Sequence, residues 1–170
     1  MEIKHENTNL NANRLILHRI YVKSSSFESY ALKLDGFQNL VNPIAEMQIL
    51  SNNYAQDNSI YQVILGLKIE AKHQGNLIWR LQLEQAGFYT IENFDEEERV
   101  AVMNGFCMNQ LYNYASTVVT NAVVQGGFAP LYLQSMDFRQ MYEDKQKESQ
   151  KVDSLSLVER AQILSKEMVN

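Results

Sequence analysis

The sequence has 170 residues and a mass of 19.6 kDa, with 45% hydrophobic residues, 21% charged residues, 7 Gly and 2 Pro. This composition is typical of one ordinary globular domain and excludes collagen-like, proline-rich and wholly disordered chains. A net charge of −5 argues against a nucleic-acid-binding protein, which would need a cationic surface. The single cysteine, Cys107, cannot form an intramolecular disulfide, and the N-terminal residues lack the pattern of a secretory signal. We therefore expect a cytoplasmic protein.

The N-terminal part predicts a loose arm followed by a strand. Residues 1–13 are polar and have no period, so we expect them to form a loose arm. We expect the folded domain to cover residues 14–142, and a helical or partly disordered tail to cover residues 143–170. The β-branched and aromatic content of residues 15–22 predicts a strand, although the imperfect alternation leaves a helix open.

The next segment predicts a long connection and a short second strand. Residues 23–43 contain serines, an Asp-Gly step and a proline, which indicate a connection, yet several of its side chains are apolar. Residues 44–50 predict a strand, and the polar residues 51–59 predict a loop.

The clearest pattern is an antiparallel hairpin. Residues 61–71 place six apolar side chains at strict period two, and residues 77–84 alternate in the same way after a five-residue turn over residues 72–76. Each strand would then have one buried and one wet face. Beyond the Ala-Gly step at Gly87 the apolar residues change phase, which predicts a bulge or bend at this glycine.

A long helix is expected after the hairpin. Asp95 followed by Glu98 resembles a capping box, which explains the acidic run 95–98 better than paired catalytic carboxylates do. Two glycines at 126–127 supply the stop. An apolar stripe recurs at helical spacing along this segment: Met103, Cys107, Leu111, Ala115, Val118 and Ala122.

The other face of this helix is unusual because it lacks charge. No charged residue occurs between Arg99 and Asp137, a gap of 37 positions, yet amides and hydroxyls interrupt the segment and exclude a membrane span. We expect this neutral face to pack against another subunit, where an unpaired charge would be costly; a merely neutral exposed face is the alternative. The predicted interface residues are Asn109, Asn113, Ser116, Thr117, Thr120 and Asn121.

The remaining chain predicts an apolar extended loop over residues 128–133 and a second helix capped by Asp137. A capping box at Ser156 and helical spacing of Leu157, Ala161, Leu164 and Met168 predict a terminal helix, which alone is marginal and must dock or fray.

Catalytic and metal-binding patterns are scarce. The histidines His5, His18 and His73 show no ligand spacing, and Cys107 lies on the apolar stripe, where a structural role is expected. We predict no catalytic residues, no metal and no cofactor. A small-ligand-binding protein or an enzyme with one pocket is the hypothesis from another class, which the lack of titratable groups in the charge-free half disfavours.

Several segments together resemble the bacterial protein-export chaperone family SecB over about residues 14–142. The segments are Arg19–Glu28 (RIYVKSSSFE), Gln85–Ile91 (QAGFYTI), Cys107–Asn109 (CMN), Tyr112–Ala115 (YNYA) and Phe128–Phe138 (FAPLYLQSMDF). The resemblance implies an α+β fold: a four-stranded antiparallel sheet followed by a long helix, a connecting loop and a second helix. It also implies a homotetramer built as a dimer of dimers, with grooves that hold unfolded secretory precursors, delivery to the translocation motor SecA, and neither cofactor nor catalysis.

This chain departs from the family pattern at the surface that the family offers to SecA. Ser24 stands where the family usually has Asp, and Gln82 lies on the wet face of the last strand, so this surface is less acidic. A SecB-like chaperone for another client, such as the antitoxin of a toxin–antitoxin system, is the alternative. The predicted client-binding residues, which match the groove-lining regions of the family, are Phe37, Leu40, Ile44, Phe128, Leu131, Leu133, Phe138, Met141 and Tyr142.

Overall fold

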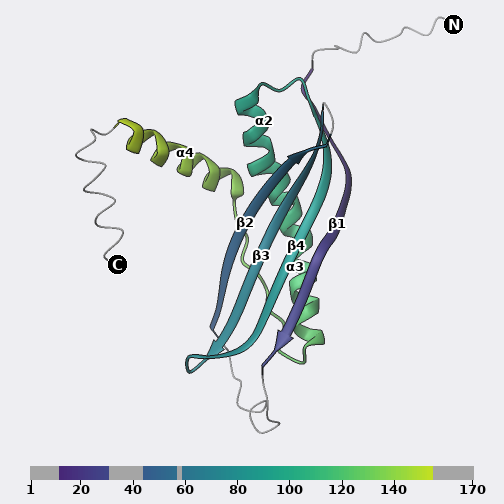
Figure 1. Cartoon of the computed structure of the whole chain (residues 1–170), viewed down its shortest axis with the longest axis vertical. Helices are drawn as coiled ribbons and strands as arrows, with labels where there is room; N and C mark the ends of the chain where they lie inside the picture. The colour runs from purple at the N-terminus through teal and green to yellow at the C-terminus, as the bar shows by residue number, and fades with distance from the viewer. Residues whose placement is uncertain (1–11, 31–43, 57–58, 155–170) are drawn as a thin grey trace, which may run out of the picture.

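The structure is a computed structural model that describes residues 12–30, 44–56 and 59–154. Its elements are β1 (Arg14–Ser29), β2 (Ile44–Ala55), β3 (Ile60–His73), β4 (Asn76–Glu92), α2 (Glu96–Val102), the π-helical turn η1 (Met103–Cys107), α3 (Met108–Gln125) and α4 (Phe138–Ser154). The strands form one antiparallel sheet of order β1-β4-β3-β2. The run α2-η1-α3 covers one face of this sheet, and α4 projects from its β2 side (Figure 1). The predicted fold class is confirmed.

The core lies between the sheet and α3, and the alternation predicted for β3 and β4 sets it. Odd-numbered side chains of both strands face the helices, whereas even-numbered ones such as Lys68 and Gln82 face away. The buried side chains on the helix-facing side are Val63, Leu65, Leu67, Ile69, Ala71, Trp79, Leu81, Leu83, Tyr89 and Ile91. Trp79, Leu81 and Leu83 thus lie on the buried face that the alternation of residues 77–84 predicts for this strand.

β1 is longer than predicted, and two irregularities explain its imperfect alternation. The register with β4 shifts between Leu17 and Arg19 and again between Val22 and Ser24, so one extra residue is inserted at each place. The expected connection over residues 23–43 is therefore wrong for its first part, because β1 continues to Ser29. Phe27, within this extension, stacks on Trp79 with 5.6 Å between ring centroids.

β2 is also longer than predicted. It runs to Ala55 instead of ending at residue 50, so the expected loop over residues 51–59 is wrong for 51–55. The polar residues are accommodated because β2 is an edge strand whose side chains here are exposed.

The hairpin between β3 and β4 has a tighter turn than predicted and no bulge at Gly87. Its turn consists of Gln74 and Gly75 alone, both with positive φ (50° and 80°), as a two-residue type I′ turn requires. No bulge occurs in β4 at Gly87, where the register with β3 is continuous; register shifts lie at two places in β1, and beside the turn, where Ala71 pairs with Trp79 but Lys72 pairs with Leu77. A Cβ at Gly87 would lie 3.2 Å from Leu111 Cδ2, so this glycine lets α3 approach the sheet.

The long helix begins and ends as predicted, and its apolar stripe faces the core. Asp95 and Glu98 form a reciprocal capping box, and Gly126 caps the helix end. Leu111 and Ala115, which follow the π turn η1, are buried as the stripe predicts; after them Val119 and Val123 are buried, while Val118 and Ala122 are half-buried and pack against the same core. All six predicted stripe residues therefore contact the core, and the prediction missed that Val119 and Val123 are more deeply buried than Val118 and Ala122.

The second helix is capped by Asp137, whose Oδ1 accepts a hydrogen bond from the Gln140 backbone N–H at 3.1 Å. α4 then continues past residue 142 to Ser154. The tail helix expected over residues 156–168 lies outside the described residues, as does the arm before residue 12. Among the helices of the described ranges, none has the length and apolar character needed to cross a membrane.

Candidate functional site

Two side chains of α3 hold the connecting loop, residues 126–137, above the helix, and a third holds the first residue of α4. Thr120 Oγ1 donates to the Leu131 carbonyl at 2.7 Å, and the Tyr112 hydroxyl donates to the Gln134 carbonyl at 2.8 Å. Asn109 Oδ1 accepts from the Phe138 backbone N–H at 3.1 Å. The loop has no regular backbone pairing, so these side chains fix its path.

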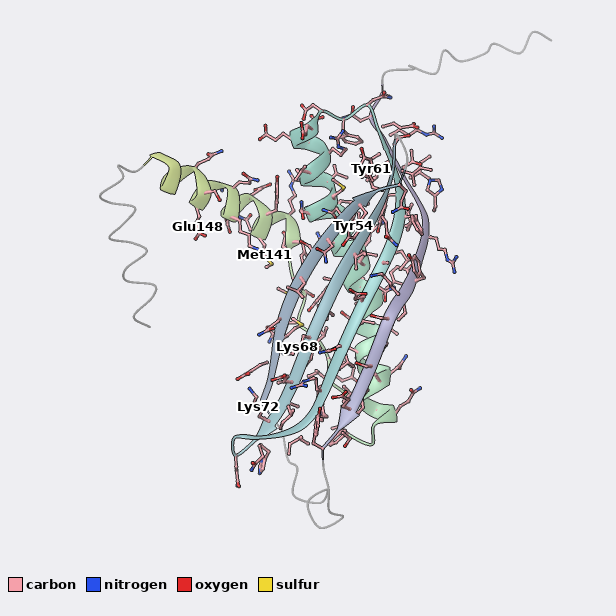
Figure 2. The ribbon with its side chains drawn as sticks, in the orientation of Figure 1. Tyr54, Tyr61, Lys68, Lys72, Met141 and Glu148 are labelled. Carbon is pink, nitrogen blue, oxygen red and sulfur yellow. The ribbon has the colours of Figure 1, made fainter. Side chains whose placement is uncertain are left out.

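An apolar groove runs between this loop and the edge strand β2. A cavity of about 540 Å³ lies between Ala45 and Met47 on β2 and loop residues 131–137. A second cavity, of about 140 Å³, continues past Ile49 and Ser51 toward the start of α4, and Met141 lines both. Met141 lies at the base of α4 beside β2 (Figure 2). We call these two cavities the β2 groove.

The groove lies along four alternate side chains of β2, from residue 45 to residue 51, which corresponds to about 20 Å of extended strand. Within the described ranges, β2 pairs only with β3, so its other edge offers backbone N–H and C=O groups to a further strand. An extended polypeptide laid here could form strand hydrogen bonds and place apolar side chains in the groove.

The structure brings some of the predicted binding residues together and buries others. Leu131, Leu133, Met141 and Tyr142 line the groove. Phe37 and Leu40 lie outside the described residues, and Ile44 begins β2 but its side chain is not among those described.

Two aromatic residues predicted for the groove pack largely against other aromatic side chains of the protein. Phe128 lies against Phe27 and Trp79, with ring centroids 6.2 and 6.3 Å away. Phe138 also lines the smaller cavity, but it is only 5% exposed and its ring centroid is 5.4 Å from that of Tyr112.

The groove contains residues that the sequence prediction missed. Tyr132, which is 77% exposed, lines the larger cavity, together with Met136 and the β2 residues. The alternation of Ala45, Met47 and Ile49 was the signal that could have identified the β2 wall.

Of the polar side chains predicted for the neutral face of α3, some form hydrogen bonds within the chain and others are exposed. Ser116 Oγ donates to the Tyr112 carbonyl at 2.8 Å, and Asn109 and Thr120 hold the loop, so these three side chains have partners within the chain. Asn113, Thr117 and Asn121 are exposed. Tyr114 and Val124, 57% and 49% exposed, lie on the same helix, so the exposed surface of α3 is uncharged and partly apolar.

The opposite face of the sheet carries ion pairs. Glu70 pairs with Lys68 at 3.3 Å, with Arg80 at 2.9 Å and with Lys72 at 3.7 Å, and Lys72 also pairs with Glu46 at 2.7 Å. Figure 2 shows Lys68 and Lys72 along this face. The hydrogen bond from Lys68, followed by that from Arg80, lowers the pKa of Glu70 below its ordinary value.

A second acidic residue on this face is similarly engaged. Glu84 Oε2 accepts from Lys23 at 2.9 Å and from the Ser24 hydroxyl at 3.2 Å, and the bond from Lys23 lowers the pKa of Glu84. The acidic groups of the outer sheet face are therefore largely compensated by neighbouring cations and donors.

Nucleophilic and metal-binding groups do not converge in the part of the chain that the structure describes. Cys107 is fully buried, and burial raises the pKa of its thiol to about 12, which agrees with a structural role. His18 Nε2 lies 2.6 Å from the Thr90 hydroxyl. Among the described residues, no group of three His, Cys, Asp or Glu side chains is arranged to hold a metal ion.

Comparisons with known proteins agree on one family. The family described as preprotein translocase subunit SecB matches residues 8–149. A protein-export protein SecB from Psychrobacter arcticus is 30% identical over 135 residues, covering 79% of this chain and 90% of that protein. The corresponding protein from Psychrobacter cryohalolentis is 29% identical over 137 residues, covering 81% and 90%.

A solved structure shows the same fold. A SecB-like chaperone from Mycobacterium tuberculosis, solved in complex with a peptide from an antitoxin, superimposes with a TM-score of 0.62 over 73% of this chain and 91% of that one. The two sequences are 15% identical over this region.

Proposed function

The chain belongs to the SecB family, and from this premise we propose that the β2 groove is where it holds its clients. As a member of this family, the protein is a molecular chaperone that keeps polypeptides unfolded for export without using ATP. Its clients are extended segments that lie along β2, and we expect it to catalyse no reaction.

The observation that carries this proposal is the combination of the apolar groove with the unpaired edge of β2. Backbone hydrogen bonds to an edge strand do not depend on side-chain identity, and an open apolar groove accepts many side chains. Each contact is small, so binding gains strength by summing contacts along an extended client. A folded protein lacks a free extended segment, so we expect the groove to select unfolded chains.

The test is suppression of aggregation of an unfolded polypeptide in the absence of nucleotide. Replacing Phe37, Leu40 and Leu133 together by Ser should weaken this suppression while the circular dichroism spectrum stays unchanged. The matched control is Leu50→Ser, because Leu50 is an exposed leucine (63%) on the opposite face of the sheet and should not affect capture. If the triple variant unfolds, the three residues belong to the core and the assignment is wrong.

We further propose that the protein assembles as a tetramer through the exposed face of α3. This face is uncharged and presents Tyr114 and Val124 beside Asn113, Thr117 and Asn121. Neutral amides and hydroxyls can pair across a contact, whereas a charge would have to be desolvated.

We propose that this protein binds SecA more weakly than a typical SecB does. The acidic residues Glu70 and Glu84 already have cationic partners within the chain, and Ser24 and Gln82 add no charge. Electrostatic docking to this face should therefore be weak. A client other than a secretory precursor, such as an antitoxin, is the alternative that this observation favours. We place the protein in the cytoplasm, where such clients are synthesised.

A further inference from the structure

The outer face of the sheet, which is turned away from the helices and from the β2 groove, carries an apolar patch. In its middle, Ile64 is 2% exposed and Ala86 is fully buried, although the helices lie on the other face (Figure 1). Large apolar side chains surround these two on the same face. We call the six residues together the outer patch: Ile64 and Ala86, with Tyr21 on β1, Phe88 on β4, and Leu50 and Tyr54 on β2.

The side chains of the outer patch are ordered on the β1 side and open on the β2 side. Tyr21 and Phe88 are stacked, with 5.8 Å between their ring centroids and 19° between the ring planes. Gln62 Nε2 on β3 donates to the Tyr21 hydroxyl at 2.6 Å. Leu50 and Tyr54 are 63% and 51% exposed, and Figure 2 shows Tyr54 on this face. A contiguous apolar surface of this kind is typical of a protein-binding site.

A hollow of about 420 Å³ lies beside the outer patch, and a glycine contributes to it. Gly66 lies between Leu50 on β2 and Glu84 on β4, and a Cβ on this glycine would be only 3.2 Å from Leu50 Cβ. Neither a bulge nor a positive φ requires glycine here. A glycine inside a regular strand often marks a place where another molecule approaches the backbone. Leu50 and Ile64 line this hollow, so it can receive an apolar side chain.

Arg19 adds a positive charge at the β1 side of the outer patch. Its guanidinium carbon lies 5.2 Å from the centroid of the Tyr21 ring, and among the described residues it has no carboxylate partner. The neighbouring cations on this face, Lys23 and Lys68, are already paired with carboxylates. An apolar patch with an unpaired cation at its rim favours a partner that is apolar and acidic. A surface of exposed carboxylates would favour the opposite charge.

The size of the outer patch argues against a second copy of this chain as the partner. Its four large side chains are partly covered and offer roughly 350 Å² of exposed surface. Two copies joined through it would bury roughly 700 Å², less than the roughly 1,200 Å² at which stable and specific interfaces begin. One side of a single short helix is enough to cover it.

We propose that the outer patch binds an acidic amphipathic helix of a partner protein. An extended segment laid on this face would find no backbone partners, because the strands beneath it pair with one another. A helix satisfies its own backbone groups and packs on a sheet face through side chains, as α3 does on the other face. An apolar side chain of the partner enters the hollow at Gly66, and a carboxylate pairs with Arg19.

The register of the sheet fixes the spacing of these two contacts. Arg19 lies two strands from Gly66 and four residues further along them, which is about 16 Å at about 4.8 Å per strand and about 3.3 Å per residue. This distance corresponds to about 11 residues of helix at about 1.5 Å per residue. Three helical turns contain about 10.8 residues, so side chains 11 positions apart lie on the same face of the partner helix.

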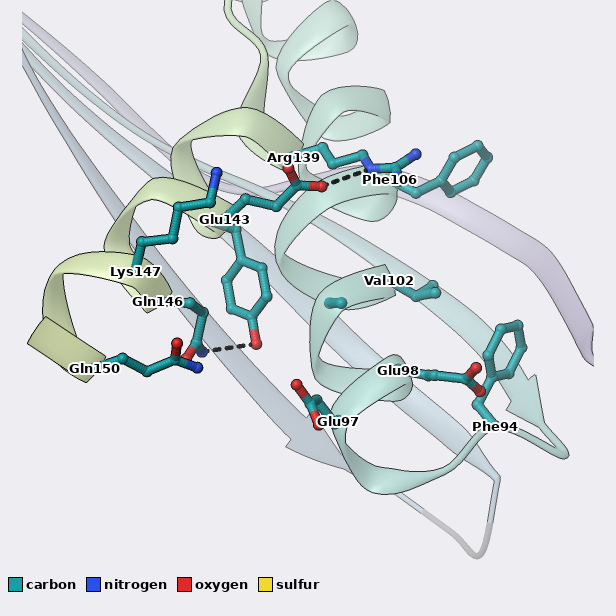
Figure 3. A pocket seen from close by; sticks show the side chains of 12 residues that line it. Phe94, Glu97, Glu98, Val102, Phe106, Arg139, Glu143, Gln146, Lys147 and Gln150 are labelled. Carbon is teal, nitrogen blue, oxygen red and sulfur yellow. Dashed lines mark hydrogen bonds and ion pairs between the residues drawn. The ribbon is translucent and has the colours of Figure 1, made fainter.

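The partner helix leaves the client-binding side of the molecule free. That side includes the β2 groove and a cleft of about 630 Å³ between α2 and α4, which Figure 3 shows. The cleft joins the groove at Tyr142, and α4 side chains along it pair with one another, Arg139 with Glu143 and Gln146 with Tyr142. None of the described residues that line these cavities belongs to the outer patch. A client and the partner helix can therefore bind together.

The first experiment titrates the full-length protein, without any client, with two labelled peptides and follows fluorescence polarisation at about 0.15 M salt. Both peptides have about 16 residues, are stapled as helices and carry leucines on one face; one has glutamates beside the leucines and the other has lysines. A stapled helix cannot pair as a strand with β2. We expect the glutamate peptide to bind at least tenfold more tightly. Equal affinities, or tighter binding of the lysine peptide, would overturn the proposal.

The second experiment locates the site with single variants. Arg19→Glu should weaken binding of the glutamate peptide at least tenfold. The matched control Arg14→Glu makes the same change of charge on β1, about 13 Å away, and should alter the affinity less than twofold because charges are screened beyond about 8 Å at this salt. Leu50→Ser should weaken binding of the glutamate peptide about tenfold while capture of an unfolded client stays unchanged.

Three results of the second experiment would contradict the proposal. Equal losses in Arg19→Glu and Arg14→Glu would show that only the net charge matters. A change in the sedimentation of the protein alone in Leu50→Ser would assign the outer patch to a contact between copies. Loss of client capture in Leu50→Ser would assign it to unfolded clients.

Discussion

Variants of two exposed tyrosines, one in the β2 groove and one on the outer face of the sheet, can distinguish an effect on client binding from an effect on stability. Tyr132 lines the β2 groove and is 77% exposed, whereas Tyr54 is 51% exposed on the outer face of the sheet. A tyrosine has roughly 200 Å² of side-chain surface, so Tyr132 exposes roughly 150 Å², worth at most about 4 kcal/mol at about 25 cal/mol per Å². A client covers only part of this surface, and the hydroxyl contributes little, so we expect about 1–2 kcal/mol.

Tyr132→Ser should therefore weaken binding of an unfolded client roughly 5- to 30-fold, as 1.4 kcal/mol corresponds to a factor of ten. Neither Tyr132→Ser nor Tyr54→Ser should change the free energy of unfolding by more than about 0.5 kcal/mol, because both side chains are exposed. Fluorescence titration with a labelled unfolded polypeptide and urea denaturation measure the two quantities. Equal loss of binding in both tyrosine variants would show that clients do not use the groove. Phe138→Ala should instead lower the free energy of unfolding by about 3–5 kcal/mol, because Phe138 is buried.

Three further predictions concern assembly, partner and pH. Asn113→Glu, on the exposed face of α3, should dissociate the tetramer in sedimentation, whereas the control Asn52→Glu on the outer sheet face should not; a monomeric parent protein would refute the interface. Calorimetry with SecA at low and moderate salt should show weak binding that Ser24→Asp with Gln82→Glu strengthens, and tight, salt-sensitive binding by the parent would defeat the argument. Burial raises the pKa of Cys107 from 9.0 to about 12, so the native thiol keeps its proton where the unfolded thiol loses it, and this contribution to stability is lost as the pH rises from about 9 to about 12. Denaturation at pH 8 and pH 10.5 should show a steeper loss for the parent than for Cys107→Ala; parallel losses would exclude this linkage.

The sequence predicted the sheet wherever one face is buried. Strict alternation in β3 and β4 places every odd residue from 63 to 71 under α3, and a slip by one residue would have exposed all of them. The same pattern did not predict the full length of β1. Because each bulge adds one residue, the next side chain to face the helix after Leu17 is Ile20, and the next after Val22 is Ser25. No fixed period therefore describes the strand. Such insertions become visible only when the partner strand is known.

The length of β2 could not be predicted for a different reason. Its second half is polar on both faces, and the five residues after Leu50 carry no apolar alternation. What keeps them extended is the continuous backbone pairing with β3, down to Ala55 opposite Tyr61. A strand held by main-chain hydrogen bonds at a sheet edge leaves little trace in its side chains.

The difference between a groove residue and a core residue depends on where the connecting loop is held. Phe128 and Tyr132 are aromatic residues of the same loop, yet Phe128 packs against Trp79 while Tyr132 stays exposed. The hydrogen bond from Thr120 to the Leu131 carbonyl lies between them, and the bond from Tyr112 to the Gln134 carbonyl follows. Both donors are on α3, so they tie the loop to the helix, and the space beside β2 stays open. The open groove is therefore a product of two polar side chains on the helix, which no count of apolar residues in the loop could reveal.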